Sequence, residues 1–130
     1  MKTDSMNEKK LELYIHIPFC VKKCDYCDFL SFPADSNTQI RYVHALLQEI
    51  RYYGNLLGDY HVPTIYIGGG TPTTLEPYQL DRLIRKIRCS FDLSDCKEFT
   101  VEAGRPDSIT REKLETLKKW DITRISINPQ

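Results

Sequence analysis

Apolar residues along the chain follow two different spacings. Short β-prone runs, rich in Ile, Val, Tyr and Thr, occur at residues 13–17, 64–67, 99–103 and 124–127. Between these runs, apolar residues recur at every third or fourth position, which is the spacing of an amphipathic helix. Three helices are expected from it: one from about Gln39 to Tyr53 and ending before Gly54, one around Leu80 to Ile87, and one over 109–120. The sequence therefore predicts the order β-α-β-α-β-α-β.

This regular alternation predicts an α/β fold, with a parallel sheet whose strands are joined by right-handed crossovers. The second strand runs into Gly68, Gly69 and Gly70, which are interpreted as a turn because glycine tolerates positive φ. Residues 1–12 are polar without periodicity and are expected to form a disordered leader. The chain stops directly after the fourth strand, where a covering helix is expected. Residues 13–130 are therefore interpreted as the N-terminal part of a truncated domain.

Composition and charge narrow the possible functions. The chain has 130 residues, of which 41% are hydrophobic, as expected for one modest domain or part of one. Lys and Arg number 18, as do Asp and Glu, so no net charge attracts nucleic acid or an anionic membrane. No segment approaches the roughly 20 apolar residues of a membrane span, and no signal peptide is recognised. We expect a cytoplasmic protein, and in such a reducing compartment clustered cysteines bind metal more often than they pair.

Cys20, Cys24 and Cys27 form a C-x3-C-x2-C segment directly after the first strand. Thiolates are ligands of iron–sulfur clusters, and three cysteines leave one iron of a four-iron cluster without a protein ligand. A structural zinc site is the weaker interpretation, because it needs four ligands and no second pair follows. Three incidental buried cysteines are the other alternative.

The other cysteines and the histidines do not extend this pattern. Cys89 and Cys96 stand alone and are interpreted as structural or incidental residues. His16, His44 and His61 are isolated from one another, so each is expected to be packed or solvated.

With Tyr26 before its last cysteine, the segment resembles the signature of the radical S-adenosylmethionine superfamily. Four segments resemble, in this order, landmarks of its oxygen-independent coproporphyrinogen III oxidase group: YIHIPFCVKKCDYCDF, YIGGGTPTTL, TVEAGRPDSIT and RISINPQ. The resemblance implies a partial TIM-like barrel of six βα units, of which about three and a half are present over residues 13–130. It thereby supports the interpretation as an N-terminal fragment.

The resemblance also implies the cofactors. Cys20, Cys24 and Cys27 would hold a [4Fe-4S] cluster whose open iron chelates S-adenosylmethionine. Reductive cleavage of that ligand yields a 5′-deoxyadenosyl radical. An electron donor such as flavodoxin or ferredoxin is implied as a partner, together with a small-molecule tetrapyrrole.

The remaining landmarks fall at strand ends, where such barrels bind their ligands. The resemblance assigns contacts with S-adenosylmethionine to seven residues: Tyr14, Tyr26, Gly69, Gly70, Thr71, Glu102 and Gln130. The glycines, with Gly68, would let the backbone approach the methionine part closely. The carboxylate of Glu102 would accept from a ribose hydroxyl or face the ligand's positive charge. No catalytic residue is assigned.

Three functions are weighed. The first is an enzyme that oxidatively decarboxylates the propionates of coproporphyrinogen III, which the EAGRPD and SINPQ segments favour. The second is a haem-binding transfer protein, because Phe29 stands where the best-defined oxidases carry another cysteine and CDF resembles the HemW-type haem chaperones. A simple iron–sulfur electron carrier is disfavoured, since it needs no open iron. The 130-residue piece alone is expected to be inactive and prone to aggregate.

Overall fold

The computed structural model describes residues 10–20, 32–33, 36–104 and 109–127. The predicted site residues Cys24, Tyr26, Cys27 and Gln130 lie outside the described residues, as does Phe29. Of the predicted leader, only residues 10–12 are described, and the Leu11 amide donates to the carbonyl of His61 at 2.9 Å.

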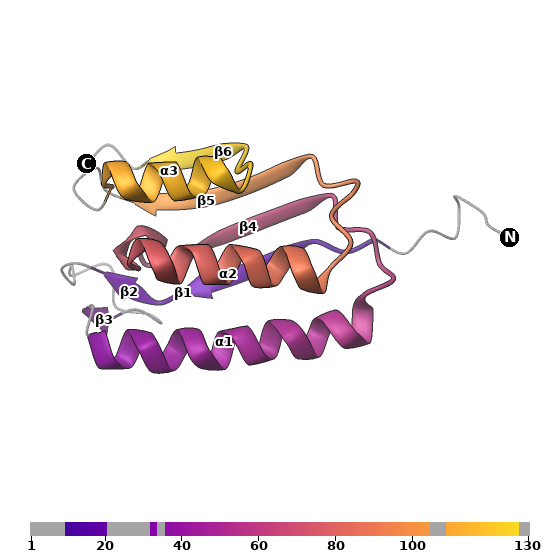
Figure 1. Ribbon diagram of the computed structural model, residues 1–130, viewed down its shortest axis with the longest axis horizontal. Helices are drawn as coiled ribbons and strands as arrows, with labels where there is room; N and C mark the ends of the chain where they lie inside the picture. Colours follow the sequence, from indigo (N-terminus) through magenta and orange to yellow (C-terminus); the bar gives the residue numbers. More distant parts are fainter. Residues whose placement is uncertain (1–9, 21–31, 34–35, 105–108, 128–130) are drawn as a thin grey trace, which may run out of the picture.

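Four strands form the main sheet: β1 (Leu13–Ile17), β4 (Thr64–Gly69), β5 (Glu98–Gly104) and β6 (Arg124–Ile127). Three α-helices follow β1, β4 and β5 in the chain: α1 (Ser36–Leu57), α2 (Pro77–Ser90) and α3 (Arg111–Lys119). The strands are ordered β1-β4-β5-β6, and every neighbouring pair is parallel. Figure 1 shows their arrowheads pointing to the same side of the molecule. The predicted α/β alternation with a parallel sheet is confirmed.

Three short elements were not predicted. β2 (Phe19–Cys20) pairs in parallel with β3 (Phe32–Pro33), and a single 3-10 turn, η2 (Pro72–Thr74), follows β4. The sequence predicted loops in these places because two or three residues carry no detectable periodicity. In Figure 1, β2, β3 and the end of β4 lie at the same side of the sheet.

Among the predicted boundaries that differ from the structure, two involve glycine. β4 continues through Gly68 and Gly69, although the turn was expected to begin at Gly68. α1 continues through Gly54 to Leu57, although it was expected to end before Gly54. Gly54 is buried, and a Cβ atom added there would lie 2.6 Å from the Cβ of Ser90. The glycine therefore lets α1 approach the end of α2 closely, a tertiary contact that outweighs its low helix propensity.

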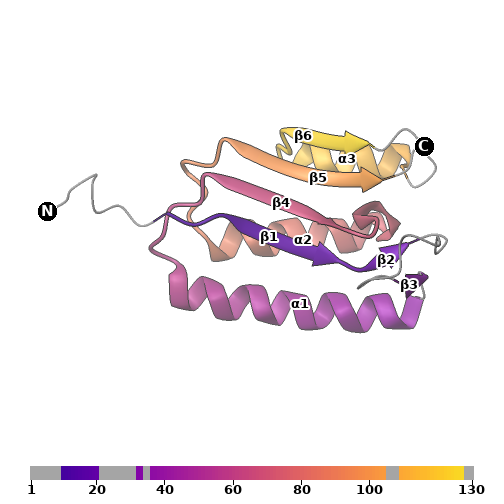
Figure 2. The ribbon, with the colours of Figure 1, turned by 180° about the vertical axis from the view of Figure 1, so that it is seen from behind.

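The core lies between one face of the sheet and the helices. Alternate strand residues are buried there, including Ile15, Ile17, Ile65, Ile67 and Val101. They pack with apolar residues of α1 and α2 such as Val43, Ile50, Leu83, Ile84 and Ile87. Figure 2 shows the sheet in front of α2 and α3 when the molecule is seen from behind, with α1 alongside β1. Among the described residues, no helix covers the opposite face.

The period-two alternation of the strands gives this opposite face a different composition. Tyr14, His16, Tyr66 and Glu102 occupy it, because each neighbours a buried apolar residue in its own strand. We call it the open face. Among the described helices, none has both the length and the apolar composition needed to cross a lipid bilayer.

Candidate functional site at the carboxyl edge of the sheet

The segment that follows β4 is bound to the end of β1 and to β2. The Gly70 amide donates to the carbonyl of Ile17 at 2.8 Å, and the Thr71 amide donates to that of Phe19 at 2.6 Å. Because Cys20 follows Phe19 in β2, this second bond places the backbone of the first predicted cluster ligand next to Thr71. The glycine segment and the start of the cysteine segment are therefore neighbours.

Gly69 has a backbone conformation that requires glycine. Its φ is +117°, and an added Cβ atom would lie 2.7 Å from the carbonyl oxygen of Ile17. The predicted positive φ is thus found at Gly69. At Gly68 an added Cβ would meet side chains instead, 2.6 Å from the ring of Tyr66 and 3.1 Å from Oε1 of Glu102. The side chains of Tyr66 and Glu102 on the open face therefore lie directly against the backbone of Gly68.

Glu102, near the end of β5, is held by two donors from β4. Its Oε2 accepts from the Tyr66 hydroxyl at 3.0 Å, and its Oε1 accepts from the Gly69 amide at 3.1 Å. A carboxylate offers about four lone-pair positions, so two donors leave it acceptor capacity. The predicted role of Glu102 as an acceptor for a ligand is compatible with this geometry.

Tyr14 and Tyr66 form an aromatic pair across β1 and β4. They are register partners, and their rings stack with centroids 6.1 Å apart and planes inclined by 16°. The Tyr14 hydroxyl is 3.0 Å from Nδ1 of His16, and the Tyr42 hydroxyl of α1 donates to the His16 carbonyl. A stacked pair backed by these bonds presents a flat aromatic surface beside Glu102.

The tyrosine hydroxyls of this pair are donors at neutral pH. Burial raises the pKa of Tyr14 above its ordinary value, and the nearby charge of Glu102 raises it further. Burial also raises the pKa of Tyr66, followed by its hydrogen bond to Glu102, while a hydrogen bond with Ser126 acts in the opposite direction. Both groups therefore stay protonated well above pH 7.

The structure brings the described part of the predicted site together at one edge. Gly69, Gly70, Thr71 and Glu102 lie at or near the carboxyl ends of the strands, which face the same way. Tyr14 is the second residue of β1 and lies further back on the open face, where it stacks on Tyr66. Thr71 is buried, and its carbonyl accepts from the amide and the hydroxyl of Thr74 at 2.9 and 2.8 Å. The ligand contacts assigned to these residues, and to Cys20, Cys24, Tyr26, Cys27 and Gln130, stay predictions.

Sequence reasoning missed Tyr66 and Ser126 and interpreted His16 only as a packed or solvated side chain. The signal that identifies them is register: Tyr66 lies opposite Tyr14, and Ser126 lies opposite Glu102. Alternation within 64–69 already places Tyr66 and Gly68 on one face. The strand pairing, which the sequence does not specify residue by residue, was the missing information.

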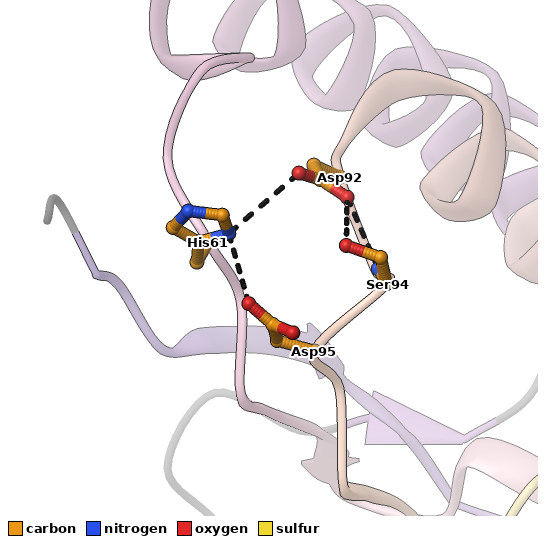
Figure 3. A network of polar contacts seen from close by, with 4 residues as sticks. All are labelled: His61, Asp92, Ser94 and Asp95. Atoms are coloured by element: carbon orange, nitrogen blue, oxygen red, sulfur yellow. Dashed lines mark hydrogen bonds and ion pairs between the residues drawn. The ribbon is translucent and has the colours of Figure 1, made fainter. Parts of the chain in front are cut away.

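A second polar cluster lies at the amino edge of the same sheet, just before β4 and β5 (Figure 3). Nδ1 of His61 is 3.1 Å from Oδ2 of Asp95 and 3.6 Å from Oδ2 of Asp92. Asp92 also accepts from the amide and hydroxyl of Ser94 at 3.1 and 2.7 Å, and these bonds hold its pKa below the ordinary value. Within the described ranges, no three His, Cys, Asp or Glu side chains are grouped so as to hold a metal ion.

Residues 14–130 match the Radical SAM superfamily, which uses S-adenosylmethionine as a radical source. The chain belongs to this superfamily. Membership implies a [4Fe-4S] cluster and S-adenosylmethionine as cofactors, in agreement with what the resemblance of the sequence motifs implied.

Similar proteins define the branch of the superfamily. The chain is 44% identical over 128 residues to the oxygen-independent coproporphyrinogen-III oxidase-like protein HemZ of Bacillus subtilis, covering 93% of this chain and 25% of that protein. It is 43% identical over 118 residues to the haem chaperone HemW of the same organism, covering 90% and 31%. It is 36% identical over 124 residues to the oxygen-independent coproporphyrinogen III oxidase of Salmonella typhimurium, covering 95% and 27%. Both an oxidase and a chaperone are therefore among its relatives.

A solved structure confirms the fold class. The structure of coproporphyrinogen III oxidase (HemN) from Escherichia coli, a radical SAM enzyme, matches 95% of this chain with a TM-score of 0.85 at 34% identity. The match covers 28% of that chain, and the chain spans about a quarter to a third of the length of the curated relatives it matches. The described sheet and helices therefore correspond to part of a radical SAM barrel.

Proposed function

We propose that the full-length protein is a radical SAM enzyme that oxidatively decarboxylates propionate groups of coproporphyrinogen III to vinyl groups. The observation that carries the proposal is the carboxyl edge in a chain of this superfamily, where Glu102 accepts from the Gly69 amide and from Tyr66, the stacking partner of Tyr14. The names of the oxidase relatives supply the substrate class. Because the chain spans only part of these relatives, the activity is proposed for the whole protein.

In this proposal, Cys20, Cys24 and Cys27 hold the cluster, and the segment from Gly69 to Thr71 accommodates the methionine part of the ligand. When bound, the two cofactors supply a 5′-deoxyadenosyl radical that abstracts hydrogen from the substrate. The fit rests on Gly68 and Gly69, where no Cβ can be placed without a close contact, so that backbone and ligand can approach. Tyr26 and Gln130 complete the contacts that the sequence predicted.

Glu102 would provide the fixed acceptor of this pocket. The Tyr66 hydroxyl and the Gly69 amide hold its two oxygens, so the carboxylate is oriented before a ligand arrives. An oriented carboxylate loses less side-chain entropy when it binds a ribose hydroxyl or an ammonium group. The stacked Tyr14 and Tyr66 would shield the same region from water on the open face.

Haem transfer is the second candidate function. It is supported by the haem chaperone relatives, at 36% to 43% identity in Buchnera aphidicola and Bacillus subtilis, and by Phe29 in place of a further cysteine. In either case we propose a tetrapyrrole as the small-molecule partner, a flavodoxin- or ferredoxin-type electron donor and a cytoplasmic location.

One experiment separates the two functions. The full-length protein is reconstituted anaerobically and supplied with a reductant, S-adenosylmethionine and coproporphyrinogen III, and the products are separated by chromatography. The oxidase predicts protoporphyrinogen together with 5′-deoxyadenosine, and neither product in a Cys24→Ala variant. Absence of protoporphyrinogen from a protein with a full cluster, combined with haem binding by absorbance, would reject the oxidase in favour of the chaperone.

A further inference from the structure

A groove of about 460 Å³ runs between α1 and α2, on the outer side of these helices. Figure 1 shows the two helices side by side. Each helix turns its buried residues to the core, and the positions between them line the groove. The walls run from His44 to Arg51 on α1 and from Arg82 to Cys89 on α2. Each wall is therefore two helical turns or roughly 10 Å long.

Four cations give this groove a positive charge: Arg51 on α1, with Arg82, Arg85 and Lys86 on α2. The three arginines are exposed, and Lys86 is half-buried. Among the described residues that line the groove, none is acidic. Because the whole chain carries no net charge, the groove is a local concentration of positive charge rather than part of a general excess. We call it the cationic groove.

The acidic residues of the same two helices point elsewhere. α1 and α2 carry one each, Glu49 and Asp81. Glu49 lines a different hollow, between β1 and α1. Asp81 accepts from Nε1 of Trp120 at 2.7 Å and from Nζ of Lys119 at 3.2 Å. The hydrogen bond with Trp120 contributes most to lowering the pKa of Asp81, and the charge of Arg85 contributes least.

The four groove cations differ in their contacts from a structural arginine of the same helix. The guanidinium of Arg88 donates to the carbonyl of Trp120 and lies over the ring of Phe99, 5.6 Å from its centroid. Within the described part of the chain, none of the four groove cations takes part in a hydrogen bond or an ion pair. Their charged groups are therefore available to a partner.

The polar lining of the groove argues against an apolar ligand. Sites for apolar small molecules enclose most of the ligand and are lined mainly by hydrophobic side chains. Here, among the described lining residues, Leu47 alone has an aliphatic side chain. His44 and Gln48 add polar groups to the α1 wall, where their Nε2 atoms are 3.3 Å apart. A matching surface is therefore polar and negatively charged.

The short length of the positive surface limits the kind of negatively charged partner. A nucleic acid carries a phosphate charge every few ångströms along its backbone and requires a longer basic surface. Both helices are followed by aspartates at the amino edge, Asp59 after α1 and Asp92 and Asp95 after α2. These would repel a long polyanion. Two helical turns of cations match a short row of carboxylates instead, each of which can accept from a guanidinium group.

We propose that the cationic groove is a docking surface for a short acidic segment of a partner protein. The glutamates or aspartates of this segment, spread over about two helical turns, pair with the four cations. The groove lies on the helix side of the sheet, so it is separate from the carboxyl-edge site on the open face. The inference does not rest on the proposed function.

The test titrates a fluorescently labelled peptide with the full-length, cluster-loaded protein and follows fluorescence anisotropy at low salt. The peptide has glutamates at every third or fourth position over two helical turns, and a second peptide has glutamines in their place. We expect saturable binding of the glutamate peptide alone. A double Arg82→Gln, Arg85→Gln variant should bind it roughly fivefold more weakly, since two exposed charge pairs are lost. Arg51→Gln, on the other wall, should bind it roughly twofold more weakly.

Charge reversal tests the complementarity directly. Arg82→Glu, Arg85→Glu should lose the glutamate peptide and gain affinity for a peptide with lysines at the same positions, which the wild type does not bind. A variant that is only destabilised would lose the first peptide without gaining the second. The matched control is Arg111→Gln, Lys118→Gln, which removes two exposed cations from α3, outside the groove, and should leave affinity unchanged. Thermal unfolding and iron content are measured for every variant.

Three results would overturn the proposal. Equal weakening by the α3 control would mean that the peptide responds to general charge. Binding that no groove variant alters, or a folded charge-reversed variant that gains no affinity for the lysine peptide, would place the contact elsewhere. Binding of inorganic tripolyphosphate at the groove arginines, without binding of the glutamate peptide, would indicate a small-anion site instead. Failure of the oxidase assay has no bearing on these titrations, so the two proposals fail separately.

Discussion

The two edges of the sheet both gather ionisable side chains, yet they are built differently. At the carboxyl edge, Glu102 is bound to the backbone of Gly69, whose φ of +117° is accessible to glycine, and to Tyr66 of the open face. At the amino edge, His61 and Asp95 meet through flexible side chains between two loops, without a positive φ among the residues involved. In barrels of this kind the carboxyl edge binds ligands and the amino edge serves stability. The comparison supports the proposal of a ligand site at the carboxyl edge, where a carboxylate is held by a constrained glycine backbone, rather than at the charged cluster of the amino edge.

Loss of a cluster ligand should have the largest effect at the carboxyl edge. Cys20→Ala, Cys24→Ala or Cys27→Ala in the full-length protein is expected to abolish the brown chromophore, because two thiolates do not retain a cluster that needs three. Iron content and visible absorbance measure this. Cys96→Ala is the matched control: burial raises the pKa of the Cys96 thiol, and this half-buried residue lies before β5, so full iron content is expected. If any one of these three variants retained the iron content of the wild type, the ligand assignment would be wrong.

Substitution of the constrained glycine should come next. Gly69→Ala places a Cβ 2.7 Å from the carbonyl oxygen of Ile17, in a residue with positive φ. We expect the free energy of unfolding to fall by about 1 to 3 kcal/mol. We also expect S-adenosylmethionine binding to be lost. Thermal unfolding and equilibrium binding measure the two losses.

Gly68→Ala sharpens the interpretation of that result. Its added methyl meets the movable rings and carboxylate of Tyr66 and Glu102 rather than backbone. We therefore expect weaker ligand binding with a much smaller change in stability. Equal destabilisation by both substitutions would show that crowding, not the backbone conformation of Gly69, is what matters.

The sequence alone predicted the main elements of the fold, but not the contacts between residues that are distant in the chain. Periodicity located the four strands of the main sheet and the three α-helices. β1 and β6 were predicted with their observed bounds, because Pro18 and short apolar runs define them locally. The end of α1 was predicted wrongly at Gly54, because this position requires a glycine only to make room for Ser90, which is distant in the sequence and close in the fold. The same limit hid Tyr66: its importance arises from Tyr14 and Glu102 across the sheet, and strand register is a property of the folded chain.

Tyr66→Phe tests the residue that sequence reasoning missed. The substitution keeps the stacked ring but removes the donor to Oε2 of Glu102, so the carboxylate is no longer held in place. We expect S-adenosylmethionine affinity to fall roughly threefold to tenfold with unchanged iron content, because the lost hydrogen bond acts on the ligand only through the orientation of Glu102 and a typical hydrogen bond contributes about 1 kcal/mol. Tyr78→Phe, on an exposed residue of α2, is the control and should leave affinity unchanged. An unaltered affinity in Tyr66→Phe would mean that the Gly69 amide alone orients Glu102.

At the amino edge, removal of the carboxylate of Asp95, a partner of His61, should affect stability but not cofactor binding. Asp95→Asn weakens the contact with His61, which lies 3.1 Å away between partly exposed groups, so we expect a loss of less than about 1 kcal/mol. Cofactor affinity and iron content should match the wild type. A variant that unfolds normally but binds S-adenosylmethionine more weakly would contradict the division of roles between the two edges.

Acidification should produce the smallest difference, a pH-dependent stability at the amino edge that the tyrosines beside the carboxyl edge do not share. The hydrogen bonds from Ser94 hold the pKa of Asp92 below its ordinary value, so the stabilisation is present above the unfolded pKa and is lost as pH falls through the folded one. Wild type and Asp92→Asn should therefore differ slightly in melting temperature at pH 7, and this difference should begin to shrink only as the pH falls below about 4, the ordinary aspartate pKa. The tyrosines of the open face do not titrate in this range, because the raised pKa values of Tyr14 and Tyr66 keep their hydroxyls neutral. Tyr66→Phe should therefore retain its binding defect from pH 6 to 8. A difference in melting temperature between wild type and Asp92→Asn that persists in acid would show that Asp92 stabilises the loop by its shape rather than by its charge.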